Sequence, residues 1–199
     1  MESQYKESNN IGGIESGGGD KEVKVANKRK TRGWDVVLRF LAVALSLAAA
    51  VVLGLDKQTK TVAVTLVPTL PPVNIPVVAK WHHLSAFVYF VVANAIACGH
   101  AAISLLLTLA NKGTNKGISI LIIILDLIMV ALLFSGIGSA LAIGLMGYEG
   151  NSHVRWPKVC NVFGKFCNQA AAAIGLSGAT SLAFFLLVVL ATFNLHKKH

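Results

Sequence analysis

The chain has 199 residues, of which 54% are hydrophobic and 14% charged, with a formal net charge of +9 and a mean hydropathy of +0.64. This length accommodates one compact bundle with loops and a tail, and it excludes a second folded domain. Most charges lie outside the apolar stretches. The basic run at residues 28–32 precedes a membrane span, so we expect it to set topology and contact lipid rather than bind nucleic acid.

Four long apolar segments predict an all-α membrane protein, a bundle of four transmembrane helices. They cover residues 36–55, 84–110, 118–146 and 170–193. Each reaches the ~20 apolar residues that cross a ~30 Å hydrocarbon core. We therefore predict a membrane domain at residues 34–195, with the first span as its insertion signal. Residues 1–33 are rich in Gly, Ser, Asn, Glu and Lys, which predicts a disordered tail, and residues 196–199 form a second tail.

The distribution of lysine and arginine predicts the orientation. Eleven of these residues lie on the side that holds both termini and the loop at 111–117, and six lie on the other side. Cytoplasmic loops carry the excess of positive charge, and the charges nearest the first span weigh most. Both termini are therefore expected in the cytoplasm.

The first outer loop, residues 56–83, combines a strand pattern with several prolines. Residues 61–66 alternate polar or small side chains with apolar ones, which predicts a short strand. The prolines that follow favour extended structure and oppose a regular sheet interior. We expect a strand followed by an extended strap; the prolines are Pro68, Pro71, Pro72 and Pro76.

Cys160 and Cys167 lie in the second outer loop, residues 148–169. An oxidising compartment favours a disulfide between them. The alternatives are a reduced pair or a metal site, but His153 alone does not complete a ligand set. Cys98 lies inside the second span and is expected to be a packing residue. No metal, cofactor or catalytic group is expected.

Small residues recur at four-residue spacing in every span, and in lipid such rows let helices approach closely. The best row in the third span is Gly136, Ala140 and Gly144. We interpret the rows as internal seams, with self-association through one outward seam as the alternative. The other rows are Ala42, Ser46, Ala50 and Gly54; Ala93, Ala97 and Ala101; and Ala171, Gly175, Ala179 and Ala183.

Two formally charged residues lie within the spans, Arg39 and Asp126. Helical rise places Arg39 roughly 5 Å and Asp126 roughly 12 Å from the cytoplasmic ends of their spans. An arginine side chain can cover that difference, and pairing would replace two isolated charges with one charge-assisted contact. The alternative is a proton or ion path, which needs further polar groups at successive depths. Only Asn94 and His100, both in the second span, add such side chains.

The second span begins with a stretch that closely resembles plant CASP-like proteins (Casparian strip membrane domain protein-like). The resemblance extends over about residues 33–193, and residues 59–78 are most similar to the subfamily-one members. It rests on Lys80 and Trp81, the stretch at 86–96, the Arg-Phe-Leu-Ala run at Arg39, Asp126 and the two outer-loop cysteines.

The resemblance implies a multi-pass plant plasma-membrane protein that forms homo- and hetero-oligomers with related four-span proteins and is distantly MARVEL-like. It also implies that Arg39 and Asp126 form the family's intramembrane pair. The founding members form platforms that recruit cell-wall-modifying enzymes. The acidic, Phe-rich first-loop signature of the Casparian-strip members is missing from residues 56–83, which argues against a direct role in that strip.

We therefore expect a non-enzymatic, oligomerising scaffold. A small channel or transporter that uses the Arg39–Asp126 pair is the alternative. An enzyme would need a converging nucleophile and base, and the adjacent His82 and His83 have no such partners in the sequence pattern.

Overall fold

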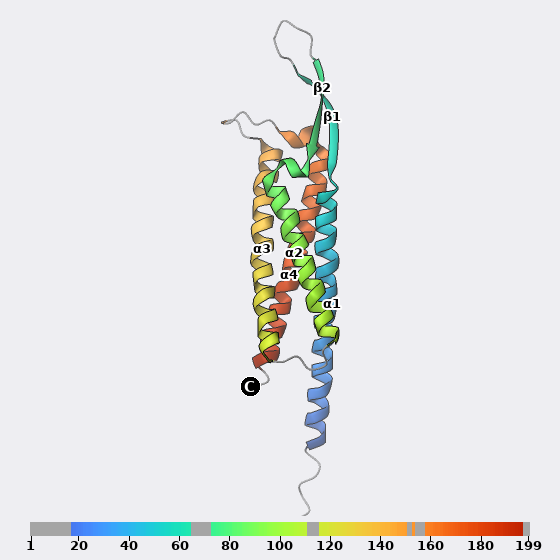
Figure 1. Ribbon diagram of the computed structural model, residues 1–199, viewed down its shortest axis with the longest axis vertical. Coiled ribbons are helices and arrows are strands. Elements are labelled where there is room, and N and C mark those ends of the chain that lie inside the picture. Colours follow the sequence, from blue (N-terminus) through green and yellow to red (C-terminus); the bar gives the residue numbers. More distant parts are fainter. Residues whose placement is uncertain (1–16, 65–72, 111–115, 151–152, 154–157, 197–199) are drawn as a thin grey trace, which may run out of the picture.

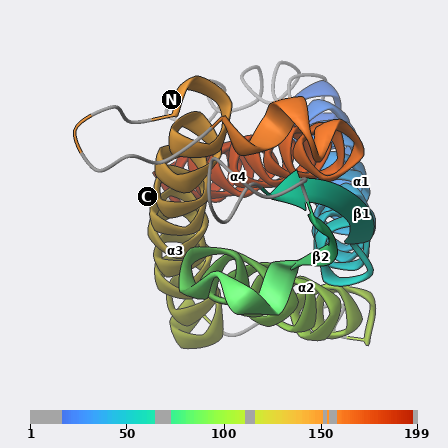
Figure 2. The ribbon, with the colours of Figure 1, turned by 90° about the horizontal axis from the view of Figure 1, so that it is seen from above.

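The computed structural model describes residues 17–64, 73–110, 116–150, 153 and 158–196. Within them, four long helices form a bundle: α1 (Gly17–Gly54), α2 (Ser85–Ala110), α3 (Lys116–Glu149) and α4 (Gly164–His196). Seen from above, the helices stand at the corners of a square, and each packs against the two next to it in the order α1, α2, α3, α4 (Figure 2). α1 and α3 are therefore diagonal to each other, as are α2 and α4.

All four helices contain a stretch long and apolar enough to cross a membrane. The predicted four-span, all-α fold is confirmed. α4 begins six residues before the predicted start of its span, and α3 continues past the predicted end of its own. The large side chains that face outward are mostly leucine, isoleucine, valine and phenylalanine, which is the arrangement that lipid requires of a helix surface.

The predicted disordered tail differs from the structure between residues 17 and 33, where α1 is already helical. Figure 1 shows this part of α1 extending beyond the ends of the other helices. A membrane span supplies a helix nucleus, and each further residue then adds one hydrogen bond at low cost. The remaining tail predictions, residues 1–16 and 197–199, lie outside the described residues, as does the loop at 111–115.

Strands β1 (Lys57–Val64) and β2 (Val73–Lys80) form an antiparallel hairpin at one end of the bundle, called here the hairpin end (Figure 1). The predicted extended strap after the first strand is thus wrong at Val73–Lys80, which pairs as a second strand. Pro76 lies opposite Thr61 in the register. A proline is tolerated there because each strand of a two-stranded sheet has one free edge. The prolines at 68, 71 and 72 lie outside the described residues.

Two short 3₁₀ helices complete the hairpin end. η1 (Trp81–His83) leads from β2 into α2, and η2 (Val159–Asn161) leads into α4. Both α2 and α4 are therefore preceded by a short helical turn at this end.

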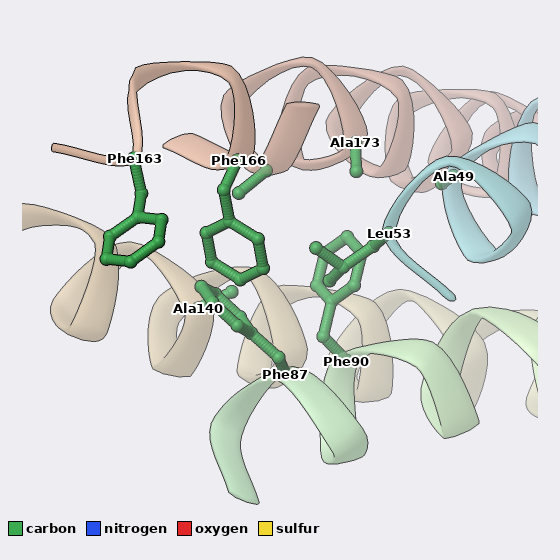
Figure 3. Close-up of a cluster of buried hydrophobic side chains, with 9 residues drawn as sticks. Ala49, Leu53, Phe87, Phe90, Ala140, Phe163, Phe166 and Ala173 are labelled. Atoms are coloured by element: carbon green, nitrogen blue, oxygen red, sulfur yellow. The ribbon is translucent and has the colours of Figure 1, made fainter. Parts of the chain in front are cut away.

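The core consists of two apolar clusters stacked along the bundle axis. The hairpin-side cluster is shown in Figure 3, with phenylalanines from α2 and from the start of α4 directed toward one another. Its members are Ala49, Leu53, Phe87, Phe90, Ala140, Phe163, Phe166, Ala170 and Ala173. The second cluster, here the charge-side cluster, contains Ala42, Ala97, Ala101, Met129, Leu133, Ala183, Phe184 and Leu187. In lipid such clusters stabilise by close van der Waals packing rather than by removal from water.

Candidate functional site

Arg39 and Asp126 meet inside the bundle, on α1 and α3. Arg39 Nη2 lies 3.2 Å from Asp126 Oδ2, and Nη1 lies 3.5 Å from Oδ1. Arg39 is 3% exposed and Asp126 is fully buried. Both guanidinium nitrogens thus face one carboxylate, in the two-point geometry that suits an arginine.

α2 contributes two more side chains to this contact. His100 Nε2 lies 2.7 Å from Asp126 Oδ1, and Arg39 Nη1 donates to Ser104 Oγ at 2.7 Å. An ionised carboxylate only accepts hydrogen bonds, so we assign the hydrogen to His100 Nε2. From α4, the ring of Phe184 stacks on the imidazole at a centroid distance of 6.0 Å.

Asp35 completes the group from the start of the first span. Its Oδ2 accepts a hydrogen bond from Arg39 Nε at 3.1 Å, one turn earlier on the same helix. Helical spacing explains this contact and also the pair His100 and Ser104, since residues four apart share one face. We call these five residues, Arg39, Asp126, His100, Ser104 and Asp35, the charge cluster.

The charge cluster ties α1, α2 and α3 together at the end of the bundle away from the hairpin. Asp126 Oδ1 faces both Arg39 and His100, while Oδ2 faces Arg39. Every nitrogen of the guanidinium has an oxygen partner. Chemically this arrangement is a closed set of mutually satisfied groups, which suits a structural clamp.

The sequence pattern identified Arg39, Asp126 and His100 but missed Asp35 and Ser104. Asp35 lies just before the predicted first span, where a charged residue is ordinary and does not indicate a buried contact. Its spacing of four from Arg39 is the signal that could have found it. Ser104 follows His100 by the same spacing, but a serine in a span is too common to single out.

The predicted seam on α3 faces the inside of the bundle. A Cβ added at Gly136 would lie 3.5 Å from Ala93 Cβ and 3.7 Å from Phe90 Cα of α2. Ala140 is fully buried in the hairpin-side cluster. Gly144 is half-buried, and a Cβ there would meet nothing within 4 Å. The seam is therefore tight in its first part and open at its end.

The small-residue row on α4 has the opposite orientation. Ala171, Gly175 and Ala179 are exposed, and the row enters the bundle only at Ala183. The interpretation of all four rows as internal seams is thus wrong for α4. Its buried face is instead built from the neighbouring positions, and the residues Ala170, Ala173, Ser177, Thr180, Ser181, Phe184 and Leu187 line it.

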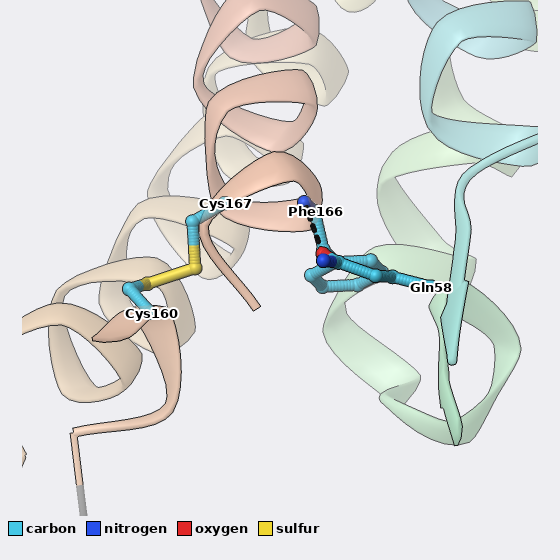
Figure 4. The surroundings of a disulfide bond; sticks show 4 residues. All are labelled: Gln58, Cys160, Phe166 and Cys167. Atoms are coloured by element: carbon cyan, nitrogen blue, oxygen red, sulfur yellow. Dashed lines mark hydrogen bonds between the residues drawn. A yellow bond between two sulfur atoms is a disulfide. The ribbon is translucent and has the colours of Figure 1, made fainter. Parts of the chain in front are cut away.

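Cys160 and Cys167 form a disulfide, as predicted, with a Cα–Cα distance of 5.7 Å (Figure 4). The bond joins η2 to the first turn of α4. Beside it, the backbone N–H of Phe166 donates to Gln58 Oε1 of β1 at 3.0 Å. The disulfide and this hydrogen bond together fix the start of α4 between η2 and the hairpin.

Cys98 is free and half-buried, and its Sγ lies 3.7 Å from the carbonyl oxygen of Val43 on α1. This placement fits the predicted packing role. Among the described residues, no three His, Cys, Asp or Glu side chains gather closely enough to hold a metal ion.

Asp56 is a buried carboxylate at the hairpin end, between α1 and β1. Asp56 is 1% exposed, and neither oxygen of its carboxylate has a hydrogen-bond partner among the described residues. Burial raises the pKa of Asp56 from 3.8 to about 6, and the nearby positive charge of Lys165 offsets part of that effect. Sequence reasoning missed this residue because it follows the span directly and looks like ordinary loop polarity.

Comparison with known proteins identifies the family of this chain. The profile of the Casparian strip membrane protein domain matches residues 28–183, which contain the complete charge cluster. The chain belongs to the CASP-like family. It is 63% identical to CASP-like protein 1E2 of Vitis vinifera over 199 residues, the full length of both chains.

Two further relatives extend the likeness. CASP-like protein 1E1 of Glycine max is 56% identical over 94% of this chain and 98% of its own length. CASP-like protein 1E1 of Arabidopsis thaliana is 50% identical over 94% of this chain and 96% of its own. The resemblance to a plant CASP-like, multi-pass membrane protein is thereby confirmed. No solved structure matches this chain, and the distant MARVEL likeness stays a prediction.

Proposed function

We propose that this CASP-like protein is a non-enzymatic membrane scaffold that assembles with copies of itself and with related four-span proteins. The observation that carries the proposal is the contrast between its seams. The rows on α1, α2 and α3 are turned inward in whole or in large part, whereas the row on α4 stays exposed. In lipid, association between helices depends on such small residues, because they let backbones approach.

The closed interior supports a scaffold over a channel. A conducting path would need polar groups or water from one end of the bundle to the other. Here the charge cluster is separated from the hairpin end by the two apolar clusters, which contain the fully buried Leu133, Phe90 and Leu53. The charged groups satisfy one another, and among the described residues the polar side chains buried between them and Asp56 at the hairpin end are all uncharged.

We further propose the plasma membrane as the site of assembly, with both termini in the cytoplasm and the hairpin end outside. The excess of lysine and arginine beside the termini supports this orientation. A disulfide at the hairpin end supports it as well, because such bonds persist in oxidising compartments. The hairpin and the loop that holds the disulfide are then the surfaces that recruited partners, such as cell-wall-modifying enzymes, would meet.

Cysteine cross-linking tests the proposed interface. In a Cys98→Ala background, Gly175→Cys places one thiol on the exposed row of α4, and mild oxidation in native membranes should give a covalent dimer. Gly99→Cys is the matched control, since Gly99 is an exposed glycine on α2 with open space around it. Equal cross-linking at both positions, or none at Gly175→Cys, would contradict assembly through α4.

A flux assay tests the channel alternative. Proteoliposomes that contain the purified protein should show no proton, potassium or chloride flux above that of protein-free vesicles. Flux that disappears in Asp126→Asn would favour the channel, because the carboxylate would then be part of a path.

A further inference from the structure

A layer of buried polar side chains separates the two apolar clusters at the middle of the bundle. Asn94 of α2 follows Phe90 of the hairpin-side cluster and precedes Ala97 of the charge-side cluster. Ser177 and Ser181 of α4 likewise lie between members of the two clusters, Ala173 on one side and Phe184 on the other. Asn94, Ser177 and Ser181 are fully buried.

Two ring contacts show that α2 and α4, although diagonal, meet across the bundle axis. Phe87 lies 5.8 Å from Phe166 on the hairpin side, and His100 lies 6.0 Å from Phe184 on the charge side. At ~1.5 Å rise per residue, the two contacts are separated by roughly 19 Å along α2 and by roughly 27 Å along α4.

Asn94 and Ser177 fall at matching depths between these two contacts. Asn94 is about halfway along the bracketed part of α2, and Ser177 is slightly beyond halfway along that of α4. Ser181 lies one turn further on the same face of α4. Asn94 and Ser177 therefore lie at one depth on opposite helices, and Ser181 lies about 6 Å further toward the charge end.

Each of the three has a polar atom without a hydrogen-bond partner among the described residues: Asn94 Oδ1, Ser177 Oγ and Ser181 Oγ. Other buried hydroxyls in this bundle satisfy themselves on their own helix. Ser46 donates to the carbonyl of Ala42 at 2.6 Å, and Thr180 donates to that of Leu176 at 3.0 Å. Ser177 and Ser181 make no such contact, although a serine in a helix can donate to a carbonyl of the preceding turn.

Asn94 has a hydrogen-bond acceptor that its own helix cannot satisfy. Its Nδ2 already donates to the carbonyl of Phe90 at 2.9 Å, which leaves Oδ1 as an acceptor in need of a donor. A helix interior offers acceptors but no spare N–H group. An unpaired polar group in a dry core costs about 1–3 kcal/mol, so each of the three needs a partner.

We propose that Asn94, Ser177 and Ser181 form a closed polar chamber that binds internal water. Water donates to Asn94 Oδ1 and exchanges hydrogen bonds with the two hydroxyls, which supplies the two to four polar partners that a buried water molecule requires. The chamber joins α2 to α4 across the axis, where direct contact is sparse. It thereby fixes the rotation of α4, the helix whose outer face carries the exposed small-residue row.

The chamber is sealed by the clusters above and below it, so its water is structural and does not connect the two membrane faces. Leu53 and Phe90 lie toward the hairpin, and Leu133 and Leu187 lie toward the charge cluster; all four are fully buried. This inference stands apart from the proposed assembly, since a bundle can hold internal water whether or not it forms oligomers.

Radiolytic hydroxyl labelling with mass spectrometry tests the chamber, because X-rays generate radicals from bound water and mark the side chains beside it. In protein reconstituted into lipid nanodiscs, Phe90 should be labelled several-fold faster than Phe87, a buried phenylalanine of the same intrinsic reactivity that lies three residues further from the layer. After rapid mixing with ¹⁸O water, the label at Phe90 should acquire ¹⁸O slowly. Equal labelling of Phe90 and Phe87 would overturn the proposal.

Variants provide the second arm. The triple change Asn94→Leu, Ser177→Ala and Ser181→Ala should abolish the excess labelling of Phe90, whereas Thr180→Val, which removes an already satisfied hydroxyl, should keep it. If the triple variant does not fold, Ser181→Ala alone should reduce the labelling. A triple variant with a higher melting temperature than the parent would show that the three groups are dry and would overturn the proposal, since a hydrated layer loses favourable contacts on replacement.

Discussion

The two ends of the bundle are stabilised by different kinds of interaction. At the charge end, Arg39 and Asp126 join α1 to α3, with His100 and Ser104 of α2 completing their contacts. At the hairpin end, the contacts are a disulfide, a hydrogen bond from β1 and an aromatic core. Charge pairing in lipid fails as a whole when one member is lost, whereas packing weakens by degrees. We therefore expect one end of the bundle to lose stability abruptly on mutation and the other to lose it gradually.

The largest expected effect comes from breaking the charge pair. Arg39→Leu or Asp126→Leu alone leaves the other charge buried without its partner, which should cost about 3–5 kcal/mol. The double variant removes both charges and should be more stable than the sum of the two losses predicts. Equilibrium unfolding in mixed micelles measures all three, and strictly additive losses would show that the two residues act independently.

The next effect tests packing at the α2–α3 contact. Gly136→Leu forces three further carbon atoms beyond Cβ against Phe90 and Ala93 and should cost about 3 kcal/mol, near the upper end for overpacking. Gly136→Ala should be tolerated, because a Cβ there meets its neighbours at 3.5 Å and beyond. Gly138→Leu is the control on the same helix, since Gly138 is exposed with open space around it. Equal losses at 136 and 138 would place the tight seam elsewhere.

Asp56 gives the hairpin end a dependence on pH. Its folded pKa of about 6 lies above its ordinary value of 3.8, so the folded state holds the proton more strongly than the unfolded one. This contribution to stability is complete below about pH 4 and is lost as pH rises through 6, by roughly 2–3 kcal/mol. Asp56→Asn should remove this slope between pH 4 and 7 while Asp35→Asn keeps it. An unchanged slope in Asp56→Asn would assign it to another group.

The smallest of these effects belongs to the disulfide. Cys160 and Cys167 are only seven positions apart, so their bond constrains the unfolded chain modestly, by about 2 kcal/mol. The double change to serine should lower stability by that amount and leave the charge end intact. A loss as large as that of Arg39→Leu would mean that the hairpin end also fails abruptly, and that the two ends do not differ.

The number of helices and the main charged pair could be predicted from the sequence because lipid imposes simple rules. A span must be long and apolar, and a buried charge must find a partner. The residues Arg39 and Asp126 stand out for that reason. The side on which a small-residue row faces could not be predicted, since every row obeys the same spacing and only the packing of neighbouring helices selects one face. The row on α4 shows this most clearly.

The second strand and the burial of Asp56 depend on contacts between distant parts of the chain. Val73–Lys80 contains a proline, which opposes a strand locally, yet pairing with Lys57–Val64 stabilises it. Asp56 is buried by the fold of the hairpin end and not by its sequence neighbours. Ser177 and Ser181 were likewise hidden, because a serine in a span becomes informative only when its partners are known, whereas Asn94 stood out as a polar side chain in the second span.

Single-molecule photobleaching tests the central claim, assembly through the exposed face of α4. With one fluorophore per chain at native expression, the wild type should bleach in two or more steps. The variant Gly175→Leu with Ala179→Leu should reach the cell surface and bleach in one step, because both changes lie outside the monomer's core. A wild type that itself bleaches in a single step would contradict the scaffold and favour the channel.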